Sequence, residues 1–105
     1  MVTAKISTQK DLNEIKNVLS RHKAELRRDY NVANIGIFGS YVRGEQKPRS
    51  DLDILVDFEQ PVSFFKFIHL ENYLEELLGV KVDLVTRKAL KPNIGRHILE
   101  EVCYL

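Results

Sequence analysis

Cysteine occurs only once in this chain of 105 residues, at Cys103. A single cysteine excludes an internal disulfide framework and fits a reducing compartment, so we expect a cytoplasmic protein. Because no CxxC spacing surrounds it, Cys103 is expected to be a small apolar residue of the core rather than a reactive thiol.

Long apolar runs and a strong charge of one sign are also missing. No stretch of 18 apolar residues could span a membrane, and residues 1–10 contain no apolar run of signal-peptide length. The formal net charge is only +1, so no global basic field points to a nucleic acid as a direct ligand. The balance of 44% hydrophobic and 30% charged residues is typical of a globular protein.

Several common catalytic motifs are absent as well. The chain has neither the Gly-x-x-x-x-Gly-Lys-Ser/Thr loop of P-loop NTPases nor the Gly-x-Gly-x-x-Gly of dinucleotide-binding folds. It also lacks the Gly-x-Ser-x-Gly turn of α/β hydrolases. The three histidines fall in expected helices without the spacing of metal ligands, and they are His22, His69 and His97. A Ser–His hydrolase and a histidine metal centre are therefore not indicated.

What the sequence does contain is an alternation of helix and strand patterns. Apolar residues recur every three or four positions over residues 8–28, which predicts an amphipathic helix capped by Ser7 or Thr8. Strands are predicted over residues 32–38, 52–58 and 80–86, a short helix from Ser40 to Gly44, and helices over about 62–78 and 93–103. This order predicts an α/β fold, in which helices pack on a small mixed sheet. We expect one domain over residues 1–105, with the N-terminal helix followed by a core over 32–105.

Two aspartates open the second predicted strand. Because side chains alternate along a strand, Asp51 and Asp53 point to one face, while Leu52, Ile54, Val56 and Phe58 point to the other. Asp83 is a similar exception in the third predicted strand, so the three carboxylates could converge if these strands are neighbours. Close carboxylates repel, and a hard cation such as Mg²⁺ offsets that cost. Taken alone, however, an Asp-x-Asp at the start of a strand is more often a solvated turn or cap.

A Gly-Ser pair lies where the first predicted strand meets the short helix. Gly39 permits a close backbone approach or a positive φ, and Ser40 can cap the helix and donate its hydroxyl to a phosphate. Arg43 lies near the same helical face and can donate to phosphate oxygens. The simpler interpretation is a turn with a capping residue.

The combination of these motifs is more specific than its parts. The segments "FGSYVRGE" (residues 38–45), "SDLDILV" (50–56) and "VDLV" (82–85) resemble the signature of the nucleotidyltransferase superfamily that includes DNA polymerase β. Within it, the chain is similar to the minimal nucleotidyltransferase (MNT) family of small prokaryotic proteins. The similarity runs from the strand before Gly39 to the C-terminal "LKPNIGRHILEEVCYL".

This resemblance implies a role for each motif residue. Gly39, Ser40 and Arg43 would bind the triphosphate of ATP. Asp51 and Asp53 would hold two Mg²⁺ ions, and the third carboxylate of the signature, Asp83, would complete the metal site near the acceptor. The implied reaction is attack of a hydroxyl on the α-phosphate with loss of pyrophosphate.

The resemblance also implies a partner. Minimal nucleotidyltransferases are typically encoded beside a HEPN-domain ribonuclease toxin, and they are thought to neutralise it by transferring AMP to a toxin tyrosine, by binding it, or both. We therefore expect an enzyme that acts as an antitoxin. A non-catalytic antitoxin that works by binding and a nucleotide-binding regulatory module are the alternatives, and a homo-oligomer also stays open.

Overall fold

A mixed sheet with four strands forms the centre of the computed structural model, which describes residues 11–90 and 92–105. The strands are β1 (Val32–Phe38), β2 (Leu52–Phe58), β3 (Val82–Thr86) and β4 (Cys103–Tyr104), in the order β3-β2-β1-β4. β2 runs antiparallel to β1 and parallel to β3, and β4 pairs antiparallel with β1. The predicted α/β class with a mixed sheet is therefore confirmed.

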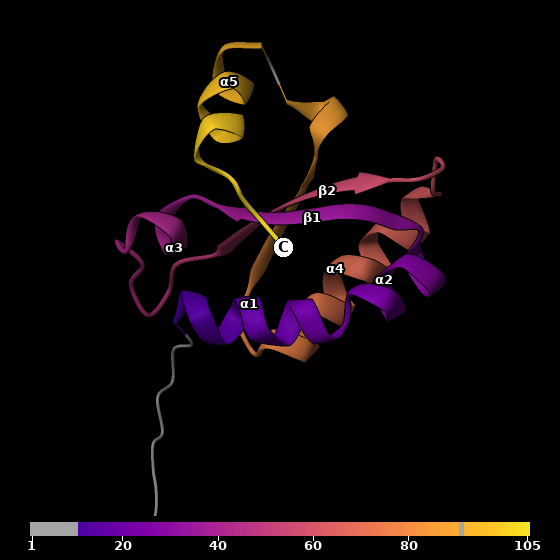
Figure 1. Cartoon of the computed structure of the whole chain (residues 1–105), viewed down its shortest axis with the longest axis horizontal. Helices are drawn as coiled ribbons and strands as arrows, with labels where there is room; N and C mark the ends of the chain where they lie inside the picture. The colour runs from indigo at the N-terminus through magenta and orange to yellow at the C-terminus, as the bar shows by residue number, and fades with distance from the viewer. Residues whose placement is uncertain (1–10, 91) are drawn as a thin grey trace, which may run out of the picture.

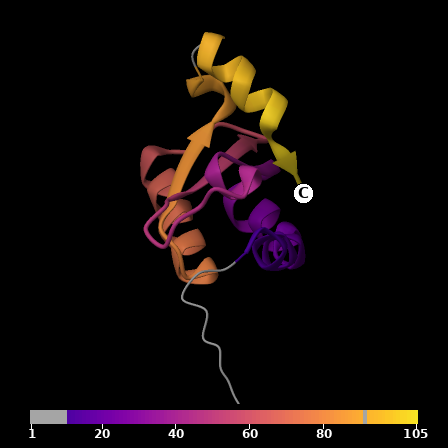
Figure 2. The same cartoon turned by 90° about the vertical axis from the view of Figure 1, so that its left-hand side faces the viewer.

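Three helices lie along one side of the sheet, and the last helix lies on the other side (Figures 1 and 2). The first group is α1 (Leu12–Arg21), α2 (Lys23–Tyr30) and α4 (Phe64–Leu78), and the last helix is α5 (Pro92–Glu101). The short helix α3 (Ser40–Arg43) follows β1 directly, and a 3-10 turn, η1 (Arg87–Ala89), follows β3. Among the described residues, no helix is both long enough and apolar enough to cross a bilayer.

The core forms where the strands' inward side chains meet α1, α2 and α4. It consists of Ile15, Leu19, Leu26, Val32, Ile35, Ile37, Tyr41, Leu52, Ile54, Val56, Leu70, Leu74, Leu78, Val82 and Leu84. Leu52, Ile54 and Val56 of β2 belong to this group and Phe58 packs against it, as the predicted alternation requires. The residues between them, including Asp53, therefore point to the opposite face of the sheet.

The helix predicted over residues 8–28 is wrong as a single element, because the chain breaks at His22. Its N–H donates to the Leu19 carbonyl in a tight turn, and its ring Nδ1 lies 2.8 Å from the Val18 carbonyl oxygen. A new helix starts there, with the Leu26 N–H bonded to the His22 carbonyl. Asp11 caps α1 in a reciprocal pair with Glu14. The predicted caps, at positions 7 and 8, lie outside the described residues.

The C-terminal end also differs from the prediction. The helix expected over residues 93–103 ends at Glu101, and the chain then adds the short strand β4 to the free edge of β1. Cys103 is part of that strand and is partly exposed rather than fully buried in the core. A fourth strand was not predicted, because a strand of two residues has no measurable alternation.

Candidate active site

Two of the predicted carboxylates lie side by side on adjacent strands. Asp53 of β2 is in register with Asp83 of β3 in the parallel ladder. The Asp53 side chain is half-buried, whereas Asp83 and Asp51 are exposed. The sheet therefore brings together two residues that are far apart in the sequence, because the second and third predicted strands are neighbours, which was the condition for the three carboxylates to converge.

The environment of Asp53 disfavours its charged form. Burial is the main reason that the pKa of Asp53 rises to about 6, and the negative charges of Asp83 and Asp51 add to the effect. A hydrogen bond with Asp83 acts in the same direction, while the positive charge of Arg43 opposes it. An additional cation beside Asp53 would offset both the cost of burying its charge and the repulsion from Asp83 and Asp51.

The chemistry of these carboxylates fits a hard divalent cation. Mg²⁺ prefers oxygen ligands, and it is usually held by one or two carboxylates together with water and substrate phosphates. Within residues 11–90 and 92–105, no three His, Cys, Asp or Glu side chains already surround a common point. The arrangement is thus a close pair, Asp53 and Asp83, with Asp51 near enough to influence the pKa of Asp53.

The Gly39 turn lies directly against Asp53. Phe38, the last residue of β1, is in register with Asp53, and Gly39 follows with φ +79° and ψ −153°. A Cβ atom on Gly39 would lie 2.1 Å from the Asp53 Oδ2. Only glycine can therefore occupy this position, because a side chain would collide with the carboxylate and the backbone lies in a region almost restricted to glycine.

Ser40 and Arg43 begin and end the short helix α3 beside this turn. Ser40 is half-buried and Arg43 is exposed. The Arg43 guanidinium lies between two carboxylates, because its Nε donates to Glu45 at 2.8 Å and its Nη1 donates to Glu101 at 2.8 Å. These ion pairs raise the pKa of Arg43 above its usual value.

Glu101 is a member of this site that the sequence analysis missed. Its second carboxylate oxygen accepts the Gly39 N–H at 2.7 Å. Partial burial acts to raise the pKa of Glu101, but the hydrogen bonds from Arg43 and the Gly39 N–H outweigh it and lower the pKa. Nothing local in the sequence could have singled out Glu101, since it is one of two consecutive glutamates at the end of a helix.

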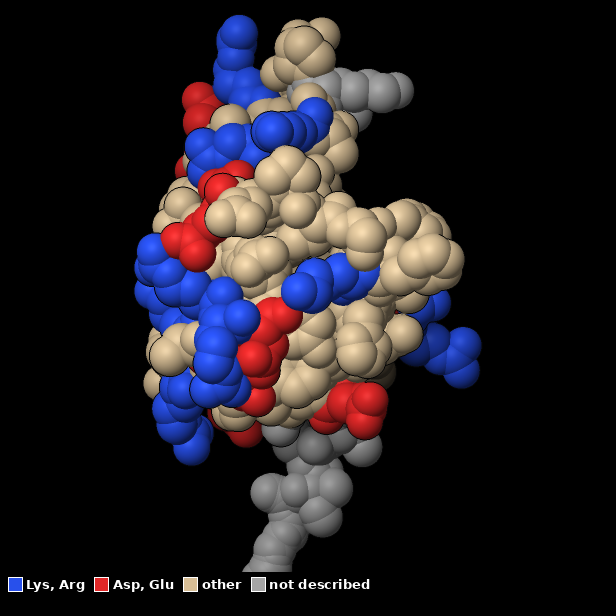
Figure 3. Space-filling view, turned by 90° about the vertical axis from the view of Figure 1, so that its right-hand side faces the viewer, with Lys and Arg blue, Asp and Glu red and all other residues tan. Residues whose placement is uncertain are grey.

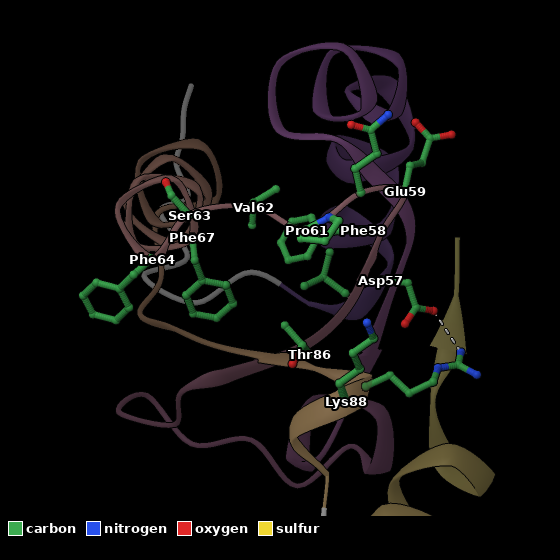
Figure 4. Close-up of a pocket in the computed structure, with 13 residues that line it drawn as sticks. Asp57, Phe58, Glu59, Pro61, Val62, Ser63, Phe64, Phe67, Thr86 and Lys88 are labelled. Carbon is green, nitrogen blue, oxygen red and sulfur yellow. Dashed lines mark ion pairs between the residues drawn. The ribbon is translucent and has the colours of Figure 1, made fainter.

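A separate cavity of about 520 Å³ lies at the other end of β2, between the start of α4 and η1 (Figure 4). Asp57 lines it and forms an ion pair with Arg87 at 3.1 Å. Asp57 is four residues beyond Asp53, which is about 13 Å along an extended strand. This cavity therefore belongs to a different part of the surface from the aspartate pair.

Comparisons with known proteins identify the family of the chain. The family model for the nucleotidyltransferase domain matches residues 19–105. Protein adenylyltransferase MntA of Thermococcus cleftensis is 56% identical over 94 residues, which covers 90% of this chain and 95% of that protein.

Two solved structures resemble the chain as well. One, assigned to the minimal nucleotidyltransferases, is 33% identical with a TM-score of 0.74, and the match covers 94% of this chain and 100% of that one. A toxin–antitoxin structure with AMP-PNP is 26% identical with a TM-score of 0.66, over 80% of this chain and 69% of that one. On the family match, the sequence identity and the shared fold, this chain belongs to the nucleotidyltransferase domain family, among its minimal (MNT) members.

Proposed function

We propose that this nucleotidyltransferase transfers AMP from ATP to a tyrosine of a HEPN ribonuclease toxin and thereby acts as an antitoxin. The observation that carries the proposal is the position of the Gly39 turn against the register pair of Asp53 and Asp83. The Gly-Ser motif, which we propose binds phosphate, therefore lies beside a carboxylate pair on the sheet. Nucleotidyl transfer needs both within reach of one triphosphate.

Each residue then has a defined role. The Ser40 hydroxyl and the Arg43 guanidinium donate to the triphosphate, and Gly39 lets its backbone approach closely. Asp51, Asp53 and Asp83 would hold Mg²⁺, with two ions as the expected number. When bound there, Mg²⁺ would neutralise phosphate charge and polarise the reacting oxygens.

The chemical step balances with these residues. The acceptor hydroxyl oxygen forms a bond to the α-phosphorus, and the bond from that phosphorus to the bridging oxygen of pyrophosphate breaks. Asp83 accepts the hydroxyl proton. Positioning and charge neutralisation supply most of the rate, since the protein forms no covalent bond to the nucleotide.

The location of Asp83 supports a protein acceptor. β3 is an edge strand of the sheet, and the Asp83 side chain is exposed. A side chain presented by another protein can therefore reach it. The related structure with AMP-PNP is a toxin–antitoxin, and the similar protein of Thermococcus cleftensis is named a protein adenylyltransferase, both of which agree with an acceptor of this kind.

A binding antitoxin without catalysis is the second candidate, and one observation favours it. Arg43 and the Gly39 N–H are already paired with Glu101, so part of the predicted phosphate site has a protein partner. Under this alternative the toxin would be blocked by contact alone.

The direct test mixes the purified chain with the HEPN protein encoded beside it, ATP and Mg²⁺, and measures the intact mass of each protein. We expect the HEPN protein to gain the mass of one or more AMP groups. The Asp51→Asn, Asp53→Asn double variant is the matched control, and it should add none. A stable complex in which the HEPN protein gains no mass would support the binding antitoxin instead.

A further inference from the structure

Glu101 contacts two parts of the motif that precedes it by about sixty residues in the chain. One carboxylate oxygen accepts the Gly39 N–H at 2.7 Å, and the other accepts Arg43 Nη1 at 2.8 Å. Both contacts are charge-assisted hydrogen bonds, which are stronger than neutral ones. A single side chain of α5 therefore ties the turn before α3 to the arginine at its end.

The backbone around Glu101 explains how it reaches that place. In the pairing of β4 with β1, Cys103 lies opposite Ile37 and Tyr104 lies opposite Gly36. Continuing this antiparallel register by two residues puts Gly39 opposite Glu101. The packing is close, because a Cβ on Gly36 would lie 2.6 Å from the Val102 side chain. The position of Glu101 is thus fixed by the strand that follows it.

We propose that Glu101 is a positioning residue for nucleotidyl transfer, which holds the Gly39–Ser40 turn and the Arg43 guanidinium in the orientation that receives the triphosphate. This inference rests on the proposed function of the same site. Gly39 has a backbone conformation outside the strand and helix regions, and Glu101 provides the acceptor for its N–H. The exposed Arg43 side chain would otherwise sample several rotamers, and that entropy would be lost on binding ATP.

The contacts leave donors available to a ligand. Within the described residues, Glu101 is bonded to the N–H of Gly39 and not to the Ser40 hydroxyl. Arg43 uses Nε for Glu45 and Nη1 for Glu101, and its Nη2 has no hydrogen bond within residues 11–90 and 92–105. Glu101 therefore orients the arginine without using its whole guanidinium, which distinguishes a positioning residue from a carboxylate that occupies the phosphate site.

The experiment compares Glu101→Ala and Glu101→Gln with the wild-type chain, measuring ATP·Mg²⁺ affinity by calorimetry without acceptor and then KM for ATP and kcat for AMP transfer. Glu101→Ala should weaken ATP binding about tenfold, as expected from the loss of charge-assisted hydrogen bonds. Glu101→Gln keeps one acceptor oxygen and should recover part of that loss. Glu100→Ala removes the same charge from the exposed neighbouring residue and should bind ATP like the wild type.

A double variant tests the path through Arg43. If Glu101 acts by orienting Arg43, Glu101→Ala should weaken ATP binding less in an Arg43→Ala background than in the wild type. Equal losses in both backgrounds would contradict this. Thermal unfolding of each variant shows whether it is folded, and the near-isosteric Glu101→Gln carries the comparison if Glu101→Ala is unstable.

Two further results would overturn the inference. Tighter ATP binding by Glu101→Ala would mean that the carboxylate blocks the site, and unchanged binding would mean that it has no role there. In both cases, AMP transfer by the wild-type chain in the same assay would leave the proposed function standing. A wild-type chain that neither binds ATP nor transfers AMP would remove the proposed function and this inference together.

Discussion

At the scale of single residues, Asp53 shows how the site is held in a state that favours a cation. Its carboxylate is half-buried beside Asp83, and its pKa is raised from 3.8 to about 6. Between those pH values the folded chain holds a proton that the unfolded chain has released. The contribution of Asp53 to the free energy of unfolding therefore falls as the pH rises through this window, and it stays low above about pH 6.

The first prediction follows from that sign. With a chelator present at pH 7, Asp53→Asn should raise the free energy of unfolding by about 1 kcal/mol, because it removes an unfavourable negative charge. This value is smaller than the full pKa shift of Asp53 would give, since the side chain is partly solvated. Below the unfolded pKa of 3.8, at about pH 3, the variant and the wild type should differ little, because Asp53 is then largely protonated in both the folded and the unfolded state. Urea unfolding at the two pH values measures this difference.

The same variant should lose the response to the metal. Mg²⁺ should raise the thermal midpoint of the wild type by binding the folded state, and it should have little effect on Asp53→Asn. AMP transfer should also be nearly abolished in the variant. A variant that is destabilised at pH 7, or that transfers AMP at the wild-type rate, would contradict the assignment of Asp53.

The second prediction compares two glycines with positive φ. Gly39→Ala should cost about 3 kcal/mol of unfolding free energy, since its φ and ψ are almost exclusive to glycine and its Cβ would collide with Asp53. Gly44 has φ +72° and ψ 24°, and nothing lies within 4 Å of its Cβ position. Gly44→Ala should therefore cost only about 1 kcal/mol, from the left-handed conformation alone. Equal costs in urea unfolding would show that Gly39 does not lie against the carboxylate.

At the scale of elements, the strands that carry the site could be predicted because their signals are local. A mostly apolar run that ends at Gly39 indicates β1, and the aspartates that interrupt the apolar pattern mark β2 and β3. The break at His22 could not be predicted, because the apolar period continues across it. The turn is marked by the backbone bond from the His22 N–H to the Leu19 carbonyl and by the contact of the His22 ring with the Val18 carbonyl, neither of which a local pattern shows. Glu101 depends on the register of β4 with β1, which no local pattern contains.

The third prediction concerns the start of α1. Asp11 accepts the Glu14 N–H at 2.8 Å, and Glu14 accepts the Asp11 N–H at 3.3 Å. Asp11→Ala should lower the free energy of unfolding by about 1 kcal/mol, because it removes the side chain that accepts the Glu14 N–H. Asp11→Asn keeps a good capping residue and should lose much less. Unfolding by urea, followed by circular dichroism, distinguishes the two variants, and an equal loss would contradict the capping role.

At the scale of the whole molecule, the net charge is too small to favour a partner of either sign. On the face seen in Figure 3, Lys and Arg side chains are mixed with Asp and Glu around a largely uncharged area. The net charge of +1 agrees with that mixture. On this face, a protein acceptor of the kind we propose would be recognised by shape and by particular residues, and its reacting group would approach the exposed edge of the sheet at β3.

The last prediction separates catalysis from binding, and it uses Asp83 because this residue lies on that edge. Asp83→Asn keeps the shape of an exposed side chain, so a surface that only binds the toxin should be unaffected, and affinity for the HEPN partner should match the wild type in calorimetry. The variant should retain much of the ATP·Mg²⁺ binding, because Asp51 and Asp53 remain, but it should stop AMP transfer because the acceptor's proton has no base. Cells that carry the toxin should then lose protection although the complex still forms. Full protection by a folded, transfer-inactive Asp83→Asn chain would show that neutralisation occurs by binding, even if the wild-type chain transfers AMP in solution.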